Sequence, residues 1–215
     1  GSASDGGVDA VEIGIPFSDP LADGPVIQAS SQIALDQGTT PADAFRLARQ
    51  IESVPVYFMT YLNPIYRYGR DRFLSRAKKA GVSGLIVPDL PPEEAGDLFS
   101  NAPLVYLCSP TCTDVRIKRV AAKSDDWIYL VALRGVTGAR KGLSSDLTPF
   151  VRRVRRFTKK SLYIGFGISS PKDAARAAEL ADGVIVGSAI LKRIESGEKP
   201  GQIERYIRSL RKAID

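Results

Sequence analysis

The sequence predicts an α/β protein in which helices cover a parallel sheet, and three observations support this fold class. Short apolar runs alternate with amphipathic helical patterns along the whole 215-residue chain, an order typical of parallel sheets. No domain boundary or low-complexity linker interrupts the alternation. Candidate functional residues follow nearly every strand, which favours a closed (β/α)8 barrel, because an open sheet collects such residues at one switch point.

Seven strands are expected, each a short run rich in aliphatic and aromatic side chains. They lie at residues 10–15, 54–59, 84–88, 104–108, 127–132, 161–166 and 183–186. Helices are expected at residues 25–37, 41–52, 70–80, 93–99, 114–123, 171–180 and 200–214, with another around 150–157 and a short one after Ser188. Because a (β/α)8 barrel needs eight strands and usually ~250 residues, the expected pattern is one strand short.

The first strand carries the strongest candidate for chemistry. Side chains alternate along a strand, so Glu12 shares a face with Ala10 and Gly14, while Val11 and Ile13 form the apolar face. A buried carboxylate without a partner is costly. Glu12 is therefore either a catalytic group or one half of a salt bridge to a distant cation.

Asp23 follows in the loop after this strand and could reach the same space. Two carboxylates near the end of one strand can divide acid and base work between them. The alternative is local: Asp23 precedes Gly24 and Pro25, where an aspartate commonly forms a helix N-cap or an Asx turn. Asp19, directly before Pro20, is interpreted as a turn residue.

Composition limits the classes of partner and location. The net charge is +6, and a basic run at residues 152–160 is compatible with nucleic acid. Apolar residues at helical spacing around that run favour a solvated helix face, so no nucleic-acid partner is expected. No apolar run approaches the ~20 residues of a membrane span and no secretory leader is seen, which predicts no membrane association and a cytoplasmic protein, or a plastid protein without its transit peptide. Residues 1–7, beginning Gly1-Ser2, are interpreted as a tag or linker remnant, and residues 8–215 as one domain.

The chain has no histidine and two cysteines, Cys108 and Cys112. Their spacing matches neither a zinc pair nor a redox motif, so no metal site is predicted. Any general base must be a carboxylate, lysine, tyrosine, cysteine or water.

Glycines close the last two strands, at Gly165, Gly167 and Gly187. Glycines let backbone N–H groups approach an anion, and late barrel strands followed by a short helix form a common phosphate site. Tight turns, with Ser188 as a helix N-cap, are the alternative. The polar, glycine-rich loop at residues 133–145 is either a lid or a plain connector.

Residues 12–28, EIGIPFSDPLADGPVIQ, closely resemble the signature of the tryptophan synthase alpha subunit family. Further motifs occur in that family's order at residues 60–64, 87–91, 135–138, 165–171 and 187–190. The resemblance implies an aldol-type lyase of tryptophan biosynthesis that cleaves indole-3-glycerol phosphate to indole and glyceraldehyde 3-phosphate. Glu12 and Asp23 would be the catalytic pair, with Glu12 transferring protons and Asp23 stabilising the indole N–H.

The resemblance also assigns binding roles. Gly138, Gly167, Gly187 and Ser188 would hold the substrate phosphate, and Thr137 would engage Asp23. Candidates for the apolar slot around the indole are Tyr61, Ile86, Leu107, Tyr129 and Phe166.

For the whole assembly, the resemblance implies a TIM barrel that lacks its first β/α unit before the strand of Glu12. It also implies an αββα heterotetramer in which the beta subunit, and no residue of this chain, carries pyridoxal phosphate. The loop at residues 16–20 and Asp89 are the expected interface. Two alternatives stay open: another phosphosugar lyase or isomerase on the same fold, and a catalytically impaired partner that only activates a beta subunit.

Overall fold

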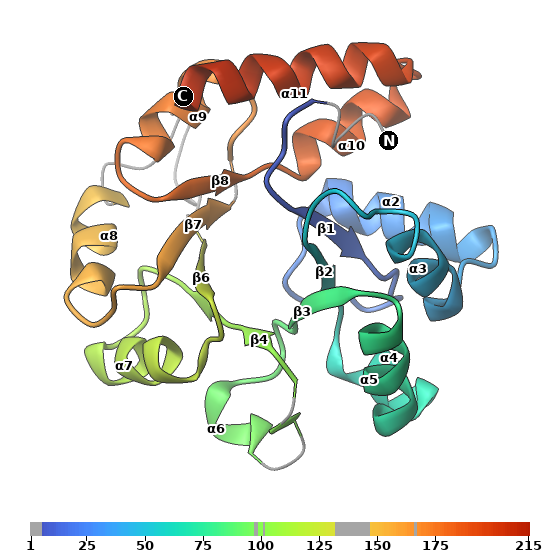
Figure 1. Ribbon diagram of the computed structural model, residues 1–215, viewed down its shortest axis with the longest axis horizontal. Coiled ribbons are helices and arrows are strands. Elements are labelled where there is room, and N and C mark those ends of the chain that lie inside the picture. The colour runs from blue at the N-terminus through green and yellow to red at the C-terminus, as the bar shows by residue number, and fades with distance from the viewer. Residues whose placement is uncertain (1–5, 97–98, 101, 132–146, 166) are drawn as a thin grey trace. The chain divides into compact units, whose positions relative to one another are not determined.

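The computed structural model describes residues 6–96, 99–100, 102–131, 147–165 and 167–215. The chain divides into two compact units, Gly1–Leu104 and Val105–Asp215. Figure 1 shows strands and helices alternating in each unit. In the part of the chain that is described, no helix is long and apolar enough to cross a membrane.

The strands of the first sheet have the order β1-β2-β3-β4, and β1, β2 and β3 pair in parallel. The strands are β1 (Val11–Gly14), β2 (Val56–Met59), β3 (Val82–Ile86) and β4 (Leu104–Val105). The helices are α2 (Pro25–Asp36), α3 (Pro41–Ala48), α4 (Leu62–Tyr68), α5 (Arg70–Lys79) and α6 (Pro92–Ala95).

One face of this sheet packs against an aromatic core. Ile13 and Ile15 of the first strand segment are buried, as is Phe58 of β2. Phe45 of α3 and Phe73 of α5 lie with their ring centroids 5.6 and 6.4 Å from that of Phe58. The predicted alternation in β1 is thereby confirmed, and Glu12 lies on the opposite face.

The second unit contains a parallel sheet of order β5-β6-β7-β8. Its strands are β5 (Leu107–Cys108), β6 (Trp127–Val131), β7 (Ser161–Gly165) and β8 (Gly183–Ile185). Its helices are α7 (Asp114–Lys123), α8 (Leu147–Arg155), α9 (Pro171–Ala178), α10 (Ser188–Glu195) and α11 (Pro200–Ile214).

Tyrosine rings cover glycines on one face of the second sheet. An added Cβ at Gly165 would lie 2.4 Å from ring atoms of Tyr129, and one at Gly183 would lie 3.0 Å from the ring of Tyr163. Trp127 continues this layer, with its ring centroid 4.9 Å from that of Tyr163. The glycines are required here because a side chain would occupy the volume of a ring.

The observed elements differ from the expected ones in several places. The helix expected at residues 41–52 ends at Ala48, and the one expected at 93–99 is the short α6, which ends at Ala95. The strand expected at residues 104–108 is two short strands, β4 and β5, separated by Tyr106. The strand expected at 84–88 is β3, two residues earlier. Helix α4 was not expected, because Pro64 lies inside it; a proline in the first turn is tolerated since its missing N–H would have no intrahelical acceptor there.

The basic run belongs to an amphipathic helix, as predicted. Phe150, Val151 and Val154 of α8 are buried. Arg153 donates to backbone carbonyls of residues 110 and 112, and Arg155 pairs with Asp182. Both arginines therefore bind other parts of the same chain.

Candidate active site

Glu12 lies on β1 with its side chain on the face opposite the buried Ile13. In register, Glu12 lies beside Tyr57 of β2. The side chain is reached by solvent, yet desolvation by the surrounding protein, assisted by the charge of Asp23, raises its pKa to about 7. A group that is reachable and poised near neutrality can both give and take a proton.

Asp23 lies in the loop between β1 and α2, and its side chain is not a helix cap. The N-cap of α2 is Gly24, with no side-chain cap hydrogen bond, so the N-cap interpretation is wrong. Instead, Oδ2 of Asp23 accepts a 2.9 Å hydrogen bond from the hydroxyl of Tyr61. Desolvation raises the pKa of Asp23, and the bond from Tyr61 opposes that rise.

Tyr61 fixes the loop that carries Asp23. Its ring is only 3 % exposed, and its hydroxyl accepts a 3.0 Å hydrogen bond from the backbone N–H of Ala22. The ring of Phe17 packs against it at a centroid distance of 5.4 Å. Tyr61 was predicted as a wall of the indole slot; its hydroxyl also binds a predicted catalytic carboxylate, a contact between residues 38 positions apart that no local pattern indicates.

Ile86 lies on the same sheet face as Glu12. The register aligns Gly14 with Met59 and Met59 with Ile86, two residues along from Glu12 in a sheet whose side chains alternate. Ile86 is fully buried. It therefore contributes to the apolar packing on the face of the sheet that carries Glu12.

Of the other residues predicted to line the indole slot, Leu107 and Tyr129 lie within the described part of the chain. Leu107 of β5 and Tyr129 of β6 are register partners; Leu107 is half-buried and Tyr129 is buried. Phe166 lies outside the described residues, as do Thr137 and Gly138. Their predicted roles stay predictions.

The predicted phosphate glycines follow β7 and β8. Gly167 has a φ of +84°, in the left-handed region that favours glycine. Gly187 is the N-cap of α10 and Ser188 is its first residue, both exposed. The alternative in which Ser188 is the N-cap is therefore wrong, and the first turn of α10 presents N–H groups that have no intrahelical acceptor.

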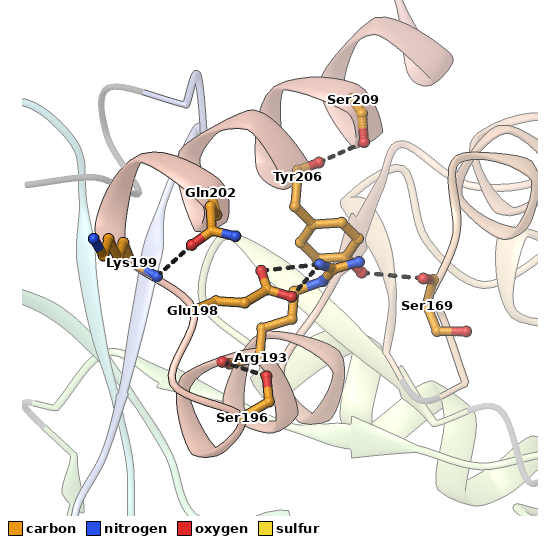
Figure 2. A network of polar contacts seen from close by, with 8 residues as sticks. All are labelled: Ser169, Arg193, Ser196, Glu198, Lys199, Gln202, Tyr206 and Ser209. Atoms are coloured by element: carbon orange, nitrogen blue, oxygen red, sulfur yellow. Dashed lines mark hydrogen bonds and ion pairs between the residues drawn. The ribbon is translucent and has the colours of Figure 1, made fainter.

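A polar network joins the segments that follow β7 and β8 (Figure 2). The hydroxyl of Tyr206 in α11 donates to the carbonyl of Ser169 at 3.2 Å. The guanidinium of Arg193 in α10 lies 3.9 Å from the centroid of the Tyr206 ring, and Glu198 binds that guanidinium at 2.7 and 3.0 Å. The contacts among Tyr206, Arg193 and Glu198 form a brace between these segments. The sequence did not indicate this brace, because Tyr206 is spaced like any apolar residue of an amphipathic helix.

The two aspartates of the predicted interface have local partners. The carboxylate of Asp89 accepts from the backbone N–H of Leu62 at 3.0 and 3.1 Å and so satisfies the start of α4. Asp19 accepts from the hydroxyl of Ser18 at 2.5 Å. Neither bond tests the predicted interface.

Among the described residues, no group of three or more histidine, cysteine, aspartate or glutamate side chains is placed to hold a metal ion. Near β1, the candidate acid–base groups are Glu12 and Asp23, and the Tyr61 hydroxyl is hydrogen-bonded to Asp23.

The family model for the tryptophan synthase alpha chain matches residues 2–213. The tryptophan synthase alpha chain of Dehalococcoides mccartyi is 48 % identical over 217 residues, covering 97 % of this chain and 85 % of that protein. The protein of the same name from Methanocaldococcus jannaschii is 43 % identical, covering 91 % of this chain and 73 % of its own.

Solved structures agree with these relatives. The crystal structure of tryptophan synthase subunit alpha from Legionella pneumophila is 36 % identical, with a TM-score of 0.88, and the match covers 100 % of this chain and 84 % of that one. A structure of Mycobacterium tuberculosis tryptophan synthase gives 32 % identity and a TM-score of 0.90, covering 99 % and 84 %. The predicted fold class, the α/β barrel of these proteins, is confirmed.

Proposed function

The chain belongs to the tryptophan synthase alpha chain family, a family of lyases in tryptophan biosynthesis, and we propose that it cleaves indole-3-glycerol phosphate to indole and glyceraldehyde 3-phosphate. The observation that carries this proposal is the pair on β1 and its loop: Glu12 with a pKa of about 7, and Asp23 held by Tyr61. A cytoplasmic location is inferred from this metabolic role.

The reaction breaks the bond between indole C3 and the first carbon of the glycerol side chain. A proton must be added at indole C3, and the hydroxyl on that same first side-chain carbon must lose a proton as the carbon becomes the aldehyde. Glu12 takes both transfers, because its near-neutral pKa leaves both protonation states populated. General acid–base groups of this kind typically contribute ~10²–10⁴ in rate.

Asp23 stabilises positive charge at the indole N–H while C3 is protonated. The Tyr61 hydroxyl opposes the rise in the pKa of Asp23 and so favours the ionised form that this role requires. Thr137 is the proposed second partner of Asp23.

Backbone N–H groups bind the phosphate of the substrate. The candidates are Gly138, Gly167, Gly187 and Ser188, and the exposed first turn of α10 at the last two supports the assignment. The brace of Tyr206, Arg193 and Glu198 holds the segments after β7 and β8 in fixed positions. The indole rests on Tyr61, Ile86, Leu107, Tyr129 and Phe166.

The partner is a beta subunit, in an αββα assembly, and pyridoxal phosphate belongs to that subunit. The loop at residues 16–20 and Asp89 form the contact. Asp19→Ala and Asp89→Ala are expected to weaken activation of the beta subunit; unchanged activation by both variants would reject this interface. Thermal unfolding of Asp89→Ala must be measured alongside, because Asp89 also binds the start of α4.

Indole release from indole-3-glycerol phosphate, with and without beta subunit, tests the proposal. Wild type is expected to release indole, and Glu12→Gln and Asp23→Asn to lose ~10²-fold or more in turnover. Glu52→Gln, at an exposed carboxylate in the segment before β2, is the matched control and should keep wild-type turnover.

Three results would overturn the assignment. Wild-type turnover by Glu12→Gln would remove Glu12 from the chemistry. Activation of a beta subunit by a wild-type chain that releases no indole would identify an impaired partner, and turnover of other phosphosugars alone would identify a different lyase or isomerase.

A further inference from the structure

The two cysteines lie together at the carboxyl end of β5. Cys108 ends that strand and is fully buried, whereas Cys112, in the turn before α7, is half-buried. The turn is closed by a 3.0 Å hydrogen bond from the N–H of Cys112 to the carbonyl of Ser109. A five-residue span that does not match a redox motif in sequence thus places both cysteines at one turn.

The sulfur of Cys112 is surrounded by donors. The side chains of Cys108 and Cys112 share a hydrogen bond, the backbone N–H of Ser109 donates to the Cys112 sulfur at 3.4 Å, and the Ser109 hydroxyl lies 3.6 Å away. These donors stabilise a negative charge on the sulfur.

Charges around the turn act in the same direction. The bond from Cys108 is the largest cause that lowers the pKa of Cys112 to about 5, with smaller contributions from Ser109 and from the Arg116 guanidinium. The pKa of Cys108 is raised, chiefly because its proton is shared with Cys112 and because it is buried. The lowered pKa of the half-buried Cys112 favours its thiolate, and burial favours the protonated thiol at Cys108.

Helix α8 holds the turn in place. Arg153 donates hydrogen bonds of 2.8 and 2.6 Å to the carbonyls of Pro110 and Cys112. The same guanidinium lies 6.0 Å from the ring centroid of Phe150 and 3.7 Å from Asp114. Helix α8 thus fixes the backbone of the turn that carries Cys112.

We propose that Cys112 is a peroxide-reactive thiolate and that Cys108 is the thiol that resolves it to a disulfide. The Cys112 thiolate attacks one oxygen of hydrogen peroxide, the O–O bond breaks, and the second oxygen leaves as hydroxide and becomes water. Cys112 is then a sulfenic acid. The Cys108 sulfur, losing its proton, attacks the Cys112 sulfur and expels the hydroxyl as a second water.

Two thiols are oxidised to one disulfide and one peroxide is reduced to two waters. A small dithiol reverses the modification by thiol–disulfide exchange.

The pH dependence of alkylation on the unmodified full chain is the first test, since it requires no variant. The rate of iodoacetamide reaction at Cys112, read by peptide mass spectrometry, should reach half its plateau near pH 5. An ordinary thiol does so near ~8.5, and a half-plateau there would overturn the proposal.

Peroxide treatment is the second test. The wild-type chain should lose the mass of two hydrogen atoms, with the disulfide inside the single tryptic peptide of residues 80–116, and a dithiol should restore it. Cys108→Ser should stop at a sulfenic acid that a 1,3-diketone traps, and Cys112→Ser should not react. The assignment would be refuted if the wild-type chain formed no internal disulfide. It would also be refuted if Cys112→Ser reacted with peroxide as readily as the wild type.

Discussion

Replacing Tyr61 by phenylalanine removes one hydroxyl that makes two hydrogen bonds. The 2.9 Å bond to Asp23 is lost, and the N–H of Ala22, 3.0 Å from the hydroxyl, loses its acceptor. A hydrogen bond to a charged group contributes about 1.5–3 kcal/mol. Because Asp23 is half-exposed, the lower end applies, and ~1.4 kcal/mol is a factor of ten in rate. We therefore expect Tyr61→Phe to lower kcat by roughly tenfold.

The assay is steady-state indole release over a range of pH. Without the Tyr61 bond, the pKa of Asp23 rises further, so the acid limb of the profile should shift to higher pH. Tyr66→Phe, at an exposed tyrosine of α4, the helix that Tyr61 precedes, is the matched control and should behave as wild type. A Tyr61→Phe enzyme with unchanged kcat and an unchanged acid limb would refute the positioning role.

Three further predictions test other parts of the structure, the first with Gly14→Ala as its control. Gly165→Ala forces a Cβ to within 2.4 Å of the Tyr129 ring, and overpacking of this kind costs about 1–3 kcal/mol; the midpoint of urea unfolding should fall. Gly14→Ala, where an added Cβ meets no atom within 4 Å, should leave that midpoint nearly unchanged. Tyr206→Phe removes the bond to Ser169 and should raise KM for the phosphate substrate several-fold with little change in kcat; an unaltered KM would argue against the brace. Since the folded-state pKa of Glu12 is raised, ionised Glu12 opposes folding, so stability falls as pH rises from about 4.5 to about 7. Glu12→Gln should therefore stabilise the protein more at pH 8 than at pH 4, and equal effects at both would contradict the raised pKa.

Local patterns predicted the strand of Glu12 well, because alternation depends only on neighbouring residues. The apolar Ile13 and Ile15 are buried and Glu12 lies on the other face. The role of Asp23 could not be settled locally: aspartate before Gly24 is a common cap, yet the cap position is Gly24 itself and the carboxylate binds Tyr61.

Contacts between elements far apart in the chain could not be predicted from the sequence. The packing of the Tyr129 ring against Gly165 depends on strand register, and the contact between Arg193 and Tyr206 depends on how α10 and α11 pack. The pairing of Cys108 with Cys112 depends on a turn whose geometry the spacing alone does not reveal.

The most direct test is the titration of the Glu12 carboxyl itself. Carbon-13 NMR of glutamate side chains across pH 3–9, with the Glu12 signal assigned by its absence in Glu12→Gln, reports its pKa without any assumption about turnover. A midpoint near 7 is expected. A midpoint at the ordinary value of 4.5 would show that β1 does not hold the proton-transferring group described here.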